Sequence, residues 1–110
     1  MKKSTKKSCK SKKVIELMNM RSSRIVYKND VRVDRMSGLG NPFKGDRNIV
    51  CDEYELWFAE RVEKRDNQRF NQDLEFIINL LEKYRKVKLF CWCVPKRCHS
   101  ETIKRFLEQI

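Results

Sequence analysis

The chain has 110 residues, which favours one domain with a real core and excludes two. Its hydrophobic content of 40% argues against disorder, and no apolar run approaches the ~20 residues of a membrane span. The formal net charge of +11 is uneven, because residues 1–13 hold seven Lys and no acid, which leaves +4 for residues 14–110. We therefore expect a mildly basic globular domain with no membrane partner.

Residues 1–13 form a Lys/Ser tail that is too polar to bury anything, so we predict a disordered basic tail before a single domain at 14–110. The tail is interpreted as a solubilising segment, a weak nucleic-acid anchor or an import signal. The chain has five cysteines, an odd number, and Cys91 and Cys93 lie two apart in a predicted strand, where they are poorly placed to bridge each other. A reduced, intracellular protein is the expectation.

The first half of the chain reads as strands followed by a long loop. Residues 14–20 are apolar enough for a buried strand, and residues 25–27 and 31–35 look like two short strand pieces around a turn at 28–30. Residues 36–45 then hold all three glycines and one of the two prolines. A ten-residue loop is long for a small domain, so we predict a binding loop.

The second half predicts two helices, a strand and a last helix. Asp46 is a candidate cap for an amphipathic helix over 47–64, and a second helix covers about 70–85. A strand at 87–93 precedes a helix at 98–109. The side chains expected to be buried in the helices are Ile49, Val50, Tyr54, Trp57, Phe58, Val62, Phe70, Leu74, Ile77, Ile78, Leu81, Tyr84, Ile103, Phe106, Leu107 and Ile110.

This order predicts a small single α/β domain with a short mixed or parallel sheet, covered by about three helices and Rossmann-like. Long helices between strands favour a parallel pairing of the first and last strands. The glycine loop and the Cys/His turn both follow carboxyl ends of strands, where ligands collect in open α/β sheets. We therefore expect the two loops to form one site.

Cys98 and His99 are the candidate catalytic residues. Neighbouring cations and a helix N-terminus lower the pKa of a thiol, which makes Cys98 the most plausible thiolate, and His99 is a possible acid–base partner. Both are placed in the first turn of the last helix, where adjacent residues diverge by about 100°, so direct pairing is not expected. A buried Cys beside a hydrogen-bonded His is the structural alternative.

Two further kinds of site are compatible with these residues. Cys91, Cys93, Cys98 and His99 are zinc-ligand types, but all four come from nine residues rather than two separated pairs, so zinc is possible and not favoured. The third interpretation is anion binding: Lys96, Arg97, Arg35 and Arg47 would hold a phosphate or carboxylate, and Phe43 or Trp92 would stack on a base.

The chain resembles the family catalogued as domain of unknown function 4326, found in bacteria and their viruses. The resemblance runs from about Val14 to Ile110 and rests on Arg35, on Gly40-Asn41-Pro42-Phe43, on Arg47 with Tyr54 and Trp57, and on Cys91-Trp92-Cys93-Val94-Pro95-Lys96-Arg97-Cys98-His99. Family members usually follow the His with Gly and often Asp, whereas this chain has Ser100 and Glu101. The resemblance implies a small α/β domain with a polar site at the Cys/His turn, but no activity.

The resulting hypothesis is a pocket that binds a nucleotide-like or other phosphorylated ligand. Its predicted ligand-binding residues are Arg35, Gly40, Asn41, Pro42, Phe43, Arg47, Trp92, Lys96 and Arg97, with directional hydrogen bonds from Asn41 and His99. One alternative is a hydrolase or transferase that uses Cys98 or His99 on a nucleotide or nucleoside. The other is a nucleic-acid-binding accessory protein that acts through residues 1–13.

Overall fold

The structure, a computed structural model, describes residues 12–110. Its elements, in chain order, are β2 (Val14–Asn19), β3 (Asp30–Arg32), α2 (Arg47–Lys64), α3 (Gln68–Tyr84), β4 (Lys86–Cys91) and α4 (Ser100–Gln109). Most of the predicted tail lies outside the described residues. Its last residue, Lys13, donates from Nζ to the carbonyl oxygens of Leu107 and Ile110.

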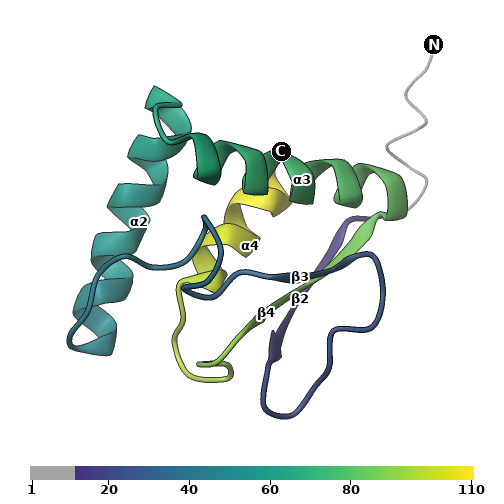
Figure 1. The fold of residues 1–110 in the computed structure, drawn as a ribbon, viewed down its shortest axis with the longest axis horizontal. Helices are drawn as coiled ribbons and strands as arrows, with labels where there is room; N and C mark the ends of the chain where they lie inside the picture. Colours follow the sequence, from purple (N-terminus) through teal and green to yellow (C-terminus); the bar gives the residue numbers. More distant parts are fainter. Residues whose placement is uncertain (1–11) are drawn as a thin grey trace.

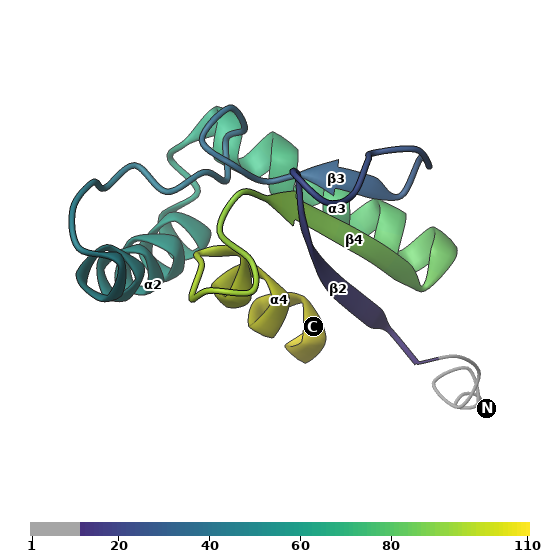
Figure 2. The same cartoon turned by 90° about the horizontal axis from the view of Figure 1, so that it is seen from below.

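The three strands form one sheet in the order β2-β4-β3, with β4 in the centre (Figure 2). Both pairings are parallel, with Ile15 opposite Val87 and Val31 opposite Leu89. The predicted parallel pairing of the first and last strands is therefore confirmed. The small α/β domain with three helices is confirmed as well, with a sheet that is parallel throughout rather than mixed.

All three helices pack on the same face of the sheet. The inward side chains of β4, Val87 and Leu89, belong to one hydrophobic cluster with buried residues of α2, α3 and α4. Figure 1 shows the helices above and to the left of the strands, whereas residues 20–29 cross on the opposite side. The domain is thus built as one layer of helices on one sheet, and the strands' carboxyl ends point toward the start of α2.

Capping side chains set the boundaries of the two long helices. Asp46 accepts hydrogen bonds from the backbone N–H groups of Asn48 and Ile49, so α2 occupies the predicted 47–64. Asn67 caps α3 by accepting from the N–H of Phe70, which starts this helix two residues before the predicted position. Among the described residues, no helix is long and apolar enough to cross a membrane.

The structure also corrects predicted strands and the start of the last helix. Residues 25–27 form no strand, because the Asp30 carboxylate accepts from the N–H groups of Val26 and Tyr27, both at 2.9 Å, and holds the chain in a turn. The next strand covers residues 30–32 instead of the predicted 31–35, and the last strand ends at Cys91 instead of residue 93. Cys98 and His99 precede α4, with His99 as its N-cap residue.

The predicted core is correct for most positions and wrong for three. Ile49, Tyr84 and Ile110 are 58%, 39% and 51% exposed. Ile49 lies one residue before the buried line of α2 that begins at Val50, and about 100° of helix rotation per residue turns it toward solvent. Tyr84 is the last residue of α3, and Ile110 is the C-cap residue of α4.

Candidate functional site

A cavity of about 450 Å³ opens at the carboxyl end of the sheet. Its wall comes from the segment after β3, the start of α2, and the end of β4 with the loop before α4. The lining residues are Arg32, Asp34, Arg35, Met36, Asn41, Gly45, Arg47, Val50, Cys51, Cys91, Trp92, Cys93, Arg97, Cys98 and His99. The glycine loop and the Cys/His turn therefore border one cavity.

The predicted site residues divide into two groups. Those that line the cavity are Arg35, Asn41, Arg47, Trp92, Arg97, Cys98 and His99, together with Cys91 and Cys93. The structure does not place Gly40, Pro42, Phe43 or Lys96 on its wall. Sequence reasoning missed the lining residues Arg32, Asp34, Met36, Gly45, Val50 and Cys51. Cys51 follows Arg47 by four residues on α2, and this helical spacing is a signal that could have found it.

The Gly-Asn-Pro-Phe segment holds Arg35, and only Asn41 of its four residues lines the cavity. Arg35 donates to the backbone carbonyl of Asn41 and, at 2.8 Å, to that of Phe43. The Asn41 side chain is engaged internally, since its amide donates to the carbonyl of Val50 and its oxygen accepts from the N–H of Phe43. The backbone carbonyls of Asn41 and Phe43 thus position the Arg35 guanidinium.

Asp34 is a buried carboxylate with three donors. It accepts from Arg32 Nε at 2.8 Å, from Trp92 Nε1 at 2.7 Å and from the N–H of Met36 at 3.1 Å. Burial acts to raise the pKa of Asp34, but the hydrogen bonds from Arg32, Trp92 and Met36 prevail and leave this pKa below its ordinary value. Asp34 is therefore ionised at neutral pH, and it fixes the indole ring at the cavity.

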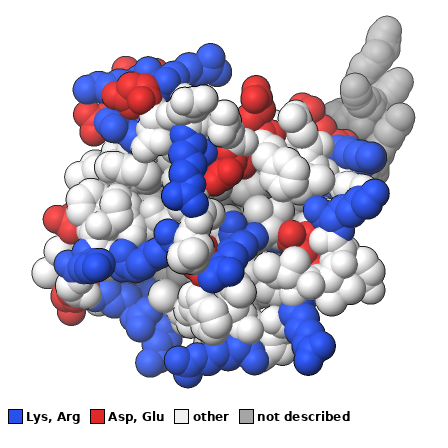
Figure 3. Space-filling model, viewed as in Figure 1, with Lys and Arg blue, Asp and Glu red and all other residues white. Residues whose placement is uncertain are grey.

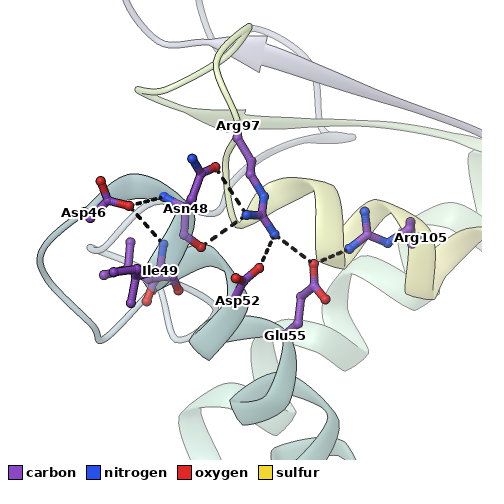
Figure 4. A network of polar contacts seen from close by, with 9 residues as sticks. Asp46, Asn48, Ile49, Asp52, Glu55, Arg97 and Arg105 are labelled. Atoms are coloured by element: carbon purple, nitrogen blue, oxygen red, sulfur yellow. Dashed lines mark hydrogen bonds and ion pairs between the residues drawn. The ribbon is translucent and has the colours of Figure 1, made fainter.

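Arg97 is held by carboxylates of α2 instead of being free for a phosphate (Figure 4). Its guanidinium contacts Asp52 at 2.7 Å and Glu55 at 3.3 Å, and Glu55 also pairs with Arg105 of α4 at 2.9 Å. The second amino group of Arg97 donates to the carbonyl of Asn48. These contacts tie the loop before α4 to α2, and they balance the Arg97 charge.

Arg35 and Arg47 differ from the other two arginines of the cavity. Within the described part of the chain, the recorded hydrogen bonds of both guanidinium groups go to backbone carbonyls, and neither pairs with a carboxylate. Arg47 donates to the carbonyl of Arg97 at 3.2 Å. A carbonyl satisfies a donor without cancelling its charge, so the cavity holds two uncompensated positive charges.

The buried end of the cavity is a cluster of thiols and an imidazole. His99 Nε2 lies 2.5 Å from the carbonyl oxygen of Val33, and because a carbonyl only accepts, Nε2 carries the proton. The other ring nitrogen, Nδ1, lies 3.5 Å from Cys98 Sγ. Burial lowers the pKa of His99, which keeps the ring neutral. The expectation that Cys98 and His99 diverge is wrong, because both precede the helix.

Cys98 and Cys91 lie side by side at 2.9 Å between their sulfur atoms. The hydrogen bond from the Cys91 thiol lowers the pKa of Cys98, and hydrogen bonds from the hydroxyl and N–H of Ser100 act in the same direction. The pKa of Cys91 is raised, first by this same hydrogen bond and then by burial. The pair therefore places the ionisable sulfur at Cys98.

The described residues contain no arrangement of ligands that would support the zinc alternative. No group of three or more His, Cys, Asp or Glu among residues 12–110 is placed to hold a metal ion. His99 explains part of this, since its Nε2 is used by Val33.

The fold and the site define a small parallel α/β domain with a cationic, thiol-lined cavity at the carboxyl edge of its sheet. The model of the family described as Domain of unknown function (DUF4326) matches residues 17–109, and the chain belongs to this family. No curated protein and no solved structure matches the chain significantly.

Proposed function

We propose that this protein binds a small phosphorylated ligand, a nucleotide or a nucleotide derivative, in the cavity beside Arg35 and Arg47. The observation that carries the proposal is the pair of guanidinium groups whose recorded partners, within residues 12–110, are backbone carbonyls. A phosphate would supply the missing negative charge, and arginine binds it through charge-assisted hydrogen bonds.

The rest of the cavity suits the organic part of such a ligand. A volume of about 450 Å³ lies within the usual ~300–1,000 Å³ of small-molecule sites. Trp92 lines the cavity, its side chain is 48% exposed, and its ring nitrogen is fixed by Asp34. A ring held in this way offers a face for stacking on a base.

The proposal is tested by calorimetric titration of the full chain with nucleoside monophosphates and diphosphates. Arg47→Ala should weaken binding by ~1.5–3 kcal/mol, the value of a hydrogen bond to a charged group. Lys83→Ala removes the same charge from α3, which contributes no residue to the cavity wall, and it should leave the affinity unchanged.

The unphosphorylated nucleosides complete the test. They should bind the wild type and Arg47→Ala equally, because only the phosphate meets the guanidinium. Equal weakening of nucleosides and nucleotides, or equal effects of Arg47→Ala and Lys83→Ala, would remove Arg47 from the site.

A second candidate is an enzyme that acts on the same class of ligand. The distance of 3.5 Å from Cys98 Sγ to the unprotonated Nδ1 of His99 favours it, because this pairs a nucleophile with a base. Chromatography of the titrated mixtures distinguishes the two: intact nucleotides favour a binding protein, and product formation that Cys98→Ser abolishes favours the hydrolase or transferase.

A further inference from the structure

The four cysteines of the described chain, Cys51, Cys91, Cys93 and Cys98, all line the cavity, but only two of them contact each other. Cys91 Sγ and Cys98 Sγ are 2.9 Å apart, whereas a disulfide needs about 2.05 Å. Cys91 ends β4, and Cys98 lies in the following loop, just before the N-cap residue His99, so the two thiols come from separate segments. A small movement of one side chain brings the sulfur atoms to bonding distance.

The two thiols have different neighbours, which suit them to different roles. His99 presents an unprotonated Nδ1 at 3.5 Å to Cys98 Sγ, and Ser100 lies with its Oγ 3.6 Å from Cys91 Sγ. His99 Nδ1 can thus accept the proton of the Cys98 thiol, and the Ser100 hydroxyl lies beside the Cys91 thiol. A thiolate with a protonated thiol as its neighbour is the arrangement of an attacking and a resolving cysteine.

We propose that Cys98 and Cys91 form a redox-active dithiol that reduces a small hydroperoxide and closes to a disulfide. The Cys98 thiolate attacks the terminal oxygen of the peroxide, the O–O bond breaks, and the departing oxygen takes a proton and leaves as water or an alcohol. Cys98 becomes a sulfenic acid. Cys91, after loss of its proton, attacks the Cys98 sulfur and expels hydroxide, which leaves as water. Two thiols are oxidised and one peroxide is reduced. Two equivalents of an external thiol then reduce the disulfide back to the dithiol and are themselves oxidised to a disulfide.

The cavity limits what reaches the pair. Cys91 and Cys98 are only 1% and 3% exposed, so an oxidant arrives through the cavity. Cys93 lines the same cavity and is half-buried, which makes it the more accessible thiol. Simple accessibility therefore favours oxidation of Cys93, whereas the geometry favours Cys91 and Cys98. The two expectations therefore differ in which cysteines are oxidised, and this can be measured.

The test uses the full chain, reduced, freed of reductant and treated with one equivalent of hydrogen peroxide. Remaining thiols are alkylated, and the protein is digested with trypsin under non-reducing conditions. Peptides 89–96 and 98–104 should appear as a disulfide-linked pair that is two hydrogen atoms lighter than their sum. Peptide 89–96 contains both Cys91 and Cys93, so Cys93→Ser identifies the partner, and the link should survive in this variant.

The Cys91→Ser variant should trap the sulfenic acid intermediate. Without its resolving thiol, Cys98 should remain a sulfenic acid that dimedone labels, whereas Cys51→Ser is the matched control and should form the disulfide normally. A wild-type protein in which Cys98 links to Cys93, or in which Cys91 and Cys98 stay alkylatable, would overturn the proposal. The test contains no nucleotide, so its outcome is independent of the proposed ligand binding.

Discussion

At the scale of single residues, Tyr54 connects the core to the cavity. Its side chain is fully buried in α2, and its ring meets that of His99 edge-on at a centroid distance of 5.1 Å. Its hydroxyl donates to the carbonyl of Leu39, in the glycine loop, at 2.7 Å. Burial raises the pKa of Tyr54 well above its ordinary value, so the hydroxyl remains a donor across the working pH range.

Tyr54→Phe should therefore destabilise the protein by about 1–3 kcal/mol, because it leaves the Leu39 carbonyl without its donor in a buried position. Urea denaturation followed by circular dichroism measures the loss. Tyr84→Phe is the matched control, since Tyr84 is 39% exposed and keeps its ring against Lys83. It should shift the free energy of unfolding by less than ~0.5 kcal/mol. Similar values for both variants would contradict the role of the Leu39 bond.

At the scale of elements, local signals predicted the helices better than the strands. The span of α2 follows from the Asp46 cap and from apolar residues at helical spacing, which are both encoded within the helix. The strand β3 has three residues, and its pairing partner is 58 positions away, where Asp30 lies opposite Lys88. No local pattern contains that information, and the apolar segment 25–27 resembled a strand although it is irregular and leads into the turn at 28–29.

The position of the candidate site could be predicted from the sequence, but the pairing of its charged residues could not. The Cys/His turn and the glycine loop follow β4 and β3, and the carboxyl-edge rule brought them to one cavity. The partners of Arg97 are Asp52 and Glu55, which lie on a helix some forty residues earlier, so the sequence did not show that its charge is balanced. The pairing of Asp34 with Trp92 is equally non-local.

Gly40 is the position at which the glycine loop packs most closely on the preceding backbone. A Cβ at this position would lie 2.4 Å from the carbonyl oxygen of Asp34 and 2.5 Å from the Cα of Arg35. Both are backbone atoms that cannot rotate away. The missing side chain thus lets the loop pack on the backbone of Arg35, while Asn41 and Phe43 hold the guanidinium.

Gly40→Ala should cost about 1–3 kcal/mol of stability, as is usual for overpacking, and should displace Arg35 and weaken nucleotide binding. Thermal denaturation and calorimetric titration measure the two effects. Pro42→Ala, an exposed position in the same loop, is the control and should cost less than ~1 kcal/mol. Full nucleotide affinity in Gly40→Ala would show that the loop does not position Arg35.

At the scale of the whole molecule, positive charge gathers near the carboxyl edge of the sheet. Loops 20–29 and 92–99 together hold five Lys or Arg and no Asp or Glu. Figure 3 shows Lys and Arg side chains along the lower part of the face drawn, whereas Asp and Glu lie mainly toward its upper edge. On the cavity wall itself, Arg35 and Arg47 add positive charge, which favours the approach of an anionic ligand.

The basic residues 1–11 allow the two anion-binding hypotheses to be separated. Removing them takes away five Lys and lowers the formal net charge from +11 to +6, while Lys13 and its contacts with the end of the chain remain. If these residues bind nucleic acid, the slope of log affinity against log salt for single-stranded DNA should become shallower by about 0.7 for each Lys that contacted a phosphate.

The shortened chain should bind mononucleotides as tightly as the full chain at moderate salt, because Arg35 and Arg47 belong to the folded part and the Debye length is then only about 10 Å. Fluorescence anisotropy with labelled DNA and calorimetry with mononucleotides measure both quantities on the same two proteins. Parallel losses of DNA and mononucleotide binding would place the anion site in the basic residues and count against the cavity. An unchanged salt slope would instead assign DNA binding to the folded domain, where Lys96 and the loop 20–29 supply the exposed charge.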